Sequence, residues 1–119
     1  MTAWQRLYAA TRELVTSAPI KYRLTEAFCC HLIHVDAAEL PVPVRSSLAE
    51  LQRELQTATP LRGESAARAT IRKLSDRDAQ QYAQRIVELW AAADARHAHD
   101  ATLRRRATTT APRTPRSVE

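Results

Sequence analysis

Apolar side chains recur every three or four residues along most of the chain, a spacing that predicts α-helices. The first predicted helix begins at Thr2, whose hydroxyl can cap it while Gln5 reaches back to the cap in a capping-box arrangement. Its outward face carries Arg6, Ala9 and Glu13. The opposite face, which we expect to pack on a core, consists of Trp4, Leu7, Tyr8, Thr11, Leu14 and Val15.

A second helix is predicted over residues 20–37, because Ser17 and Pro19 just before it are residue types that favour a helix start. It carries two apolar stripes about half a turn apart. The main stripe is Ile20, Leu24, Ala27, Phe28, His31, Leu32 and Val35. The second stripe is Tyr22, Cys29 and Ile33. Two stripes indicate either a central helix, covered on both sides within the molecule, or a helix that faces a partner.

Prolines at positions 41 and 43 interrupt the helical pattern, and Pro43 can open a third helix. Its narrow apolar stripe is Val44, Leu48, Leu51 and Leu55. A loop over residues 57–63 and a short helix over residues 65–74 follow. Ser75 then offers a cap, with Asp78 in the capping-box position, for a last helix that extends to about His97. Its broad apolar face is Ala79, Tyr82, Ala83, Ile86, Val87, Leu89, Trp90 and Ala93.

The composition supports an all-α fold. Hairpins and sheets would need Gly-rich turns and alternating β-branched runs. The chain contains a single Gly and no such run. A chain of 119 residues is long enough for one core without disulfides or metal, and short for two domains. We therefore predict a compact bundle of four main helices plus one short helix over residues 1–103.

The net charge of +5 is concentrated at the C-terminus. Residues 1–103 hold 13 basic and 12 acidic side chains, whereas residues 104–119 hold five arginines and one glutamate. This last segment has almost no large apolar side chain, so burial cannot offset the entropy of ordering it. It is predicted to be a disordered, Arg-rich tail.

Few residues suggest chemistry. Cys29, Cys30, His31 and His34 are the densest group of metal-capable side chains, but no second pair completes the four ligands of a structural zinc site. No phosphate-binding loop, nucleophile elbow or paired-carboxylate motif occurs. We expect no enzyme activity, no cofactor and no small-molecule substrate. No apolar run reaches the ~20 residues of a membrane helix, and the adjacent cysteines suit a reducing compartment, so a cytoplasmic protein is expected.

Two binding hypotheses follow, from different classes of protein. In the first, the protein is a non-catalytic interaction module that docks on another protein or on itself through Tyr22, Cys29 and Ile33. In the second, it is a nucleic-acid accessory protein whose basic side chains contact phosphates and give salt-sensitive affinity. The residues of the second hypothesis are Arg62, Arg68, Arg72, Lys73, Arg77, Arg104, Arg105 and Arg106.

One resemblance accompanies these patterns. It is carried by Pro60-Leu61-Arg62-Gly63-Glu64, by Ala69-Thr70-Ile71-Arg72-Lys73-Leu74-Ser75 and by Gln81-Tyr82-Ala83-Gln84-Arg85-Ile86-Val87. Over about residues 4–93 the chain resembles a family of small bacterial helical proteins to which no activity is assigned. The resemblance implies a helical fold and brings no cofactor or binding residue.

Overall fold

Five α-helices and two short 3₁₀ turns make up the protein, in a computed structural model that describes the backbone of residues 1–113 and the side chains of residues 1–107. The helices are α1 (Ala3–Glu13), α2 (Ile20–Cys30), α3 (Val42–Glu54), α4 (Ala66–Lys73) and α5 (Asp76–Arg113), and the turns are η1 (Leu32–His34) and η2 (Ala37–Glu39). Residues 1–113 contain no strand. The predicted all-α bundle of four main helices and one short helix, α4, is confirmed.

Local capping signals define several helix starts. The Thr2 hydroxyl accepts a hydrogen bond from the Gln5 amide at 3.1 Å, and the Thr2 amide donates to Gln5 Oε1 at 2.8 Å, which completes the predicted capping box of α1. Ser65 Oγ accepts from the Arg68 amide at the start of α4, and Ser75 Oγ accepts from the Asp78 amide at the start of α5. These bonds satisfy amides that have no partner inside the helix. By contrast, α2 has Pro19 at its N-cap and no side-chain cap.

The second helix is shorter than predicted. α2 ends at Cys30 and is followed by η1 and η2, so the expectation of a continuous helix over residues 20–37 is wrong. The cause lies in α3, where Gln52 Nε2 donates to the carbonyl oxygens of Leu32 at 3.0 Å and Val35 at 2.9 Å. These carbonyls are thereby satisfied outside an α-helix, and the chain turns toward α3.

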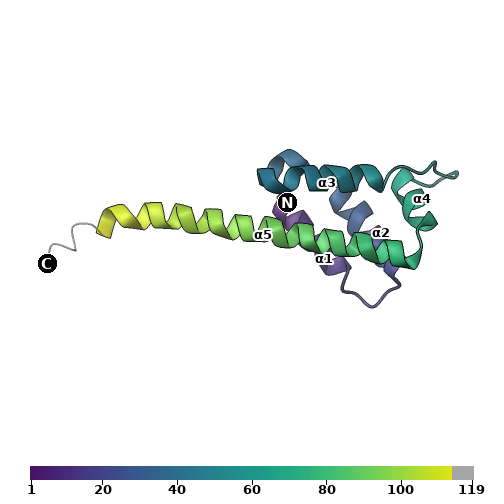
Figure 1. Cartoon of the computed structure of the whole chain (residues 1–119), viewed down its shortest axis with the longest axis horizontal. Coiled ribbons are helices and arrows are strands. Elements are labelled where there is room, and N and C mark those ends of the chain that lie inside the picture. The colour runs from purple at the N-terminus through teal and green to yellow at the C-terminus, as the bar shows by residue number, and fades with distance from the viewer. Residues whose placement is uncertain (114–119) are drawn as a thin grey trace.

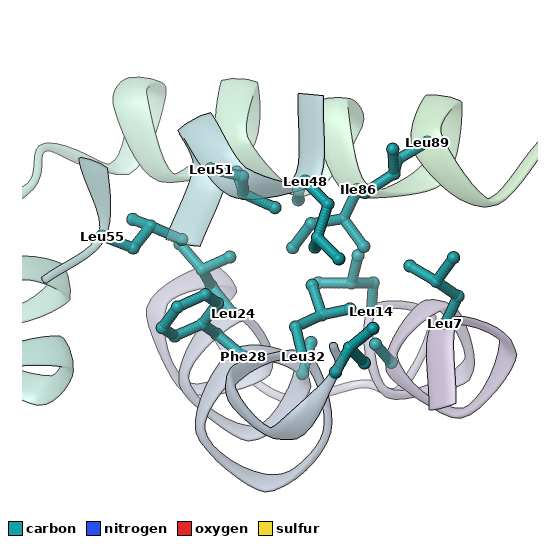
Figure 2. Packing of buried hydrophobic residues seen from close by; sticks show 14 of the residues in the cluster. Leu7, Leu14, Leu24, Phe28, Leu32, Leu48, Leu51, Leu55, Ile86 and Leu89 are labelled. Atoms are coloured by element: carbon teal, nitrogen blue, oxygen red, sulfur yellow. The ribbon is translucent and has the colours of Figure 1, made fainter. Parts of the chain in front are cut away.

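The core lies between two layers of helices. In Figure 2, side chains from α3 and α5 meet those from α1 and α2, with Leu48 and Ile86 opposite Leu14 and Leu32. The helix α4 packs against α2 at one end of this arrangement. The largest fully buried side chains are Phe28, Leu7, Leu24, Leu32, Leu48, Leu51, Leu55, Ile71 and Ile86. Every stripe residue predicted for α3 is among the buried residues.

Some predicted core residues are exposed instead. Val15 lies beyond the end of α1, where the helical spacing no longer applies, and is 78% exposed. Tyr8 and Val87 lie at the edges of their apolar faces and are 43% and 40% exposed. The broad apolar faces of α1 and α5 are therefore wider than the surfaces that their neighbours cover.

The helix α5 extends far beyond the core. Among the side chains of α5 that are described, Ala93 is the last that is fully buried. Beyond it, the Trp4 ring of α1 stacks on the His97 ring, with 4.9 Å between the ring centroids. Residues 98–113 then continue as helix for about 24 Å away from the other helices (Figure 1). The radius of gyration of 18.8 Å accordingly exceeds the ~13.5 Å of a globule of this length.

This extension differs from the expected tail, because residues 104–113 belong to α5. The first of these residues, Arg104 to Ala107, are strong helix formers, and a helix already fixed by packing can lengthen without new nucleation. Residues 114–119 lie outside the described residues. Among the helices that are described, none is both long and apolar enough to cross a lipid bilayer.

Candidate functional site

The three residues of the predicted second stripe do not form one exposed face. Tyr22 lies on α2 and is 59% exposed. Cys29 is half-buried and Ile33 lies in η1, beyond the end of α2, and both pack against the core. Of these three side chains, only that of Tyr22 is exposed.

The neighbouring cysteines and histidines form local contacts. Burial raises the pKa of the Cys29 thiol, and burial together with Glu26 raises the pKa of the Cys30 thiol, whose Sγ lies 3.8 Å from Glu26 Oε2. His31 Nε2 lies 3.1 Å from Glu13 Oε2. A raised pKa keeps a thiol protonated, and the protonated form is a poor nucleophile and metal ligand. In the part of the chain that the structure describes, no three metal-capable side chains come together.

A groove between α2 and α4 brings together residues from both binding hypotheses. Its volume is about 300 Å³. Tyr22 lies on the α2 side, and Arg68 and Arg72 lie on the α4 side, with the buried Ile71 between them in sequence. The complete lining is Lys21, Tyr22, Thr25, Glu26, Glu64, Arg68, Ile71 and Arg72.

The α4 wall of this groove is fixed by a bidentate ion pair. Arg72 Nε donates to Glu64 Oε2 at 2.8 Å and Arg72 Nη2 donates to Glu64 Oε1 at 3.1 Å. Glu64 Oε1 also accepts from the Leu61 amide at 3.0 Å. The Arg72 side chain, followed by the Leu61 amide, lowers the pKa of Glu64 to about 2. Gly63 supplies the positive φ of +79° that lets the loop turn back toward α4.

Lys21 joins the two walls. Its Nζ donates to the carbonyl oxygen of Arg72 at 3.1 Å, near the end of α4, where carbonyls lack partners inside the helix and a cation is favourable. The side chains of Tyr22 and Arg68, in contrast, make no hydrogen bond or ion pair with any other residue that the structure describes. The groove therefore has fixed walls and two side chains available for a ligand.

The remaining basic residues lie in two separate places. Arg62, Lys73 and Arg77 are exposed near the ends of α4. Arg104, Arg105 and Arg106 lie on the extended part of α5. Along α5, Arg77 and Arg105 are about 42 Å apart. The structure thus divides the predicted nucleic-acid set into two groups, at opposite ends of the molecule (Figure 1).

The sequence alone did not identify Lys21, Thr25, Glu26 or Glu64 as lining residues. One signal was present for Glu64, because Glu64, Arg68 and Arg72 are spaced by four residues, which places them on one side of a helix and its N-terminal loop. The three α2 residues carried no such signal, since only the packing of α2 on α4 makes them part of a groove.

Comparison with protein-family models, with curated proteins and with solved structures found no match for this chain. The resemblance to a family of small helical proteins therefore stays a prediction.

Proposed function

We propose that the protein is a non-catalytic helical interaction module that docks on a partner protein through the groove between α2 and α4. The observation that carries this proposal is the juxtaposition of Tyr22 and Arg68, both exposed and without side-chain partners, over the buried Ile71. Tyrosine and arginine are enriched at protein interfaces, where one supplies contact area and the other directional hydrogen bonds. Rigid walls around them reduce the entropy that binding would cost.

The charges in the groove favour a protein over a nucleic acid. Three cations, Lys21, Arg68 and Arg72, share it with the carboxylates of Glu26 and Glu64. Phosphate binding depends on several cations whose charge is not compensated nearby, and the charge of Arg72 is compensated by Glu64 at 2.8 Å. The partner that fits this chemistry presents a carboxylate to Arg68 and an apolar side chain to Tyr22.

The size of the groove sets the expected affinity. A single groove of about 300 Å³ corresponds to a small contact area, which is typical of weak or transient complexes unless the partner also contacts neighbouring surface. We therefore expect an interaction that is lost when one of its two anchoring side chains is removed.

The test is affinity purification of the full chain from its native cell, with and without nuclease treatment. Tyr22→Glu and Arg68→Glu are each expected to abolish capture of the same protein, because both side chains lie in the groove. Arg53→Glu, an exposed charge reversal on α3 outside the groove, is the matched control and should leave capture unchanged. Capture that survives both groove variants would refute the proposal.

The same experiment decides the nucleic-acid alternative. Its contacts would be Arg68, Arg72 and Lys73 of α4 and the Arg-rich C-terminal segment, together with the exposed Arg62 and Arg77. That alternative requires bound material that nuclease removes, and retention on nucleic acid at ~50 mM salt that weakens steeply as salt rises. Nuclease-resistant capture together with no retention at ~50 mM salt would exclude it.

A further inference from the structure

A second groove, between α3 and α5, has an apolar floor and an acidic rim. Its volume is about 270 Å³. Leu51 and Leu89 are almost fully buried at its floor, and Glu50 and Glu88 lie at its rim. The complete lining is Pro43, Val44, Ser47, Glu50, Leu51, Arg85, Glu88, Leu89 and Ala92.

The one cation in this lining is already paired. Arg85 Nη1 and Nη2 donate to the two carboxylate oxygens of Glu54 at 2.8 and 3.1 Å, and Tyr82 donates to the same carboxylate at 3.0 Å. The carboxylates of Glu50 and Glu88 therefore dominate the charge of the rim. A ligand of this groove should carry an apolar side chain beside positive charge.

The extended part of α5 carries that combination. Leu103 is 46% exposed and is followed by Arg104, Arg105 and Arg106. Leu103 lies fourteen residues after Leu89, which at 100° per residue is within about 40° of four whole turns. It therefore lies on the face of α5 that lines the groove, but about 21 Å farther along the axis. Because both residues belong to one straight helix, Leu103 cannot reach the groove of its own chain.

We propose that two copies of this chain pair through antiparallel α5 helices, each placing Leu103 in the groove between α3 and α5 of the other. A register that sets Leu103 opposite Leu89 puts the twofold axis at Arg96 and sets Arg104 opposite Glu88. The apolar contact and the opposite charges thus agree in a single register. Such an interface is self-complementary, as closed dimers require.

The residues at the axis are compatible with this register. The two Arg96 side chains would approach each other, and each is partly neutralised by Asp100 of its own chain, whose Oδ1 lies 3.8 Å from Arg96 Nε. The small side chain of Ala92 lies opposite Asp100 and leaves room for a close approach of the two helices. The pairing uses neither Tyr22 nor Arg68, so it is independent of the groove between α2 and α4.

The test is the oligomeric state of the full chain, measured by sedimentation equilibrium over a range of concentrations. The wild-type chain is expected to form a dimer. Leu103→Asp is expected to raise the dissociation constant more than about tenfold, because each dimer loses two buried leucines and places two carboxylates against the acidic rims. Circular dichroism serves as the folding control, since Leu103 lies outside the core.

A charge exchange tests the register. Glu88→Arg and Arg104→Glu should each weaken the dimer, and the double variant should restore it, because both contacts then re-form with reversed charge. Asp78→Arg, an exposed reversal near the start of α5, is the matched control and should have no comparable effect. A wild-type chain that stays monomeric at ~1 mM, a Leu103→Asp variant that dimerises like wild type, or a double variant without rescue would each overturn the proposal.

Discussion

Gln52 holds the turn in which α2 ends, and its removal should have a measurable cost. One amide nitrogen donates to two backbone carbonyls, of Leu32 at 3.0 Å and Val35 at 2.9 Å, in a partly buried position. A hydrogen bond of this kind contributes about 0.5–1.5 kcal/mol net, so Gln52→Ala should lower the free energy of unfolding by about 1–3 kcal/mol. That is a large share of the roughly 5–15 kcal/mol that stabilises a typical domain.

Gln52→Glu sharpens this prediction, because it keeps the size of the side chain and replaces the donor by a carboxylate that faces two carbonyl oxygens. Repulsion should raise the pKa of the introduced carboxyl in the folded state above its unfolded value. At a pH below the carboxyl's unfolded pKa, Gln52→Glu should therefore be about as stable as Gln52→Ala. It should lose further stability as the pH rises through the carboxyl's folded pKa.

Urea unfolding followed by circular dichroism at pH 4 and pH 7 measures both effects. Gln52→Glu should be the less stable of the two variants at pH 7, and the gap should close at pH 4. A loss below ~0.5 kcal/mol for Gln52→Ala, or two variants that differ equally at both pH values, would show that these bonds do not hold the turn.

Three further predictions concern single contacts. Phe28→Ala should cost about 3–5 kcal/mol in urea unfolding, because Phe28 is 0% exposed, whereas Tyr22→Ala should change stability by less than ~0.5 kcal/mol. Thr2→Ala removes the capping box of α1 and should cost about 1 kcal/mol by the same measurement. An NMR titration should give Glu64 a pKa of about 2 that returns toward 4.5 in Arg72→Met. Because this pKa is lowered on folding, the ion pair stabilises the fold above the unfolded pKa and its contribution is lost as the pH falls through about 2.

Where structure is decided by neighbours in the sequence, the sequence predicted it. The caps at Thr2, Ser65 and Ser75 act over three residues, and each begins a helix where expected. The buried stripe of α3 follows from spacing alone. The fold class could be predicted because these signals are local and agree with one another.

Structure that depends on contacts between distant parts of the chain could not be predicted from the sequence. Nothing near Cys30 ends a helix, since neither Gly nor Pro follows it, and the partner that stabilises the turn is Gln52, more than twenty residues later. The end of α5 is another case. A composition without large apolar residues predicts disorder for an isolated segment, whereas residues 104–113 follow directly on a helix that packing already fixes.

The candidate groove shows the same division. Tyr22 and Arg68 were each singled out from the sequence, but for different hypotheses, because they are 46 residues apart and nothing in their spacing relates them. The packing of α4 on α2 brings them to one groove. It also brings Glu26 and Glu64 there, and these carboxylates shift the balance from a phosphate ligand to a protein ligand.

The two proposed surfaces have a geometric consequence when they are combined. Antiparallel pairing about Arg96 sets the starts of the two α5 helices, at Asp76, about 60 Å apart along the axis. Because α4 directly precedes α5, the two grooves between α2 and α4 would lie at opposite ends of the dimer. A partner with two docking segments would then bind more tightly than either segment alone, since the second contact is intramolecular. Leu103→Asp should remove only this gain, whereas Tyr22→Glu should remove binding itself, so the failure of one proposal is distinguishable from the failure of the other.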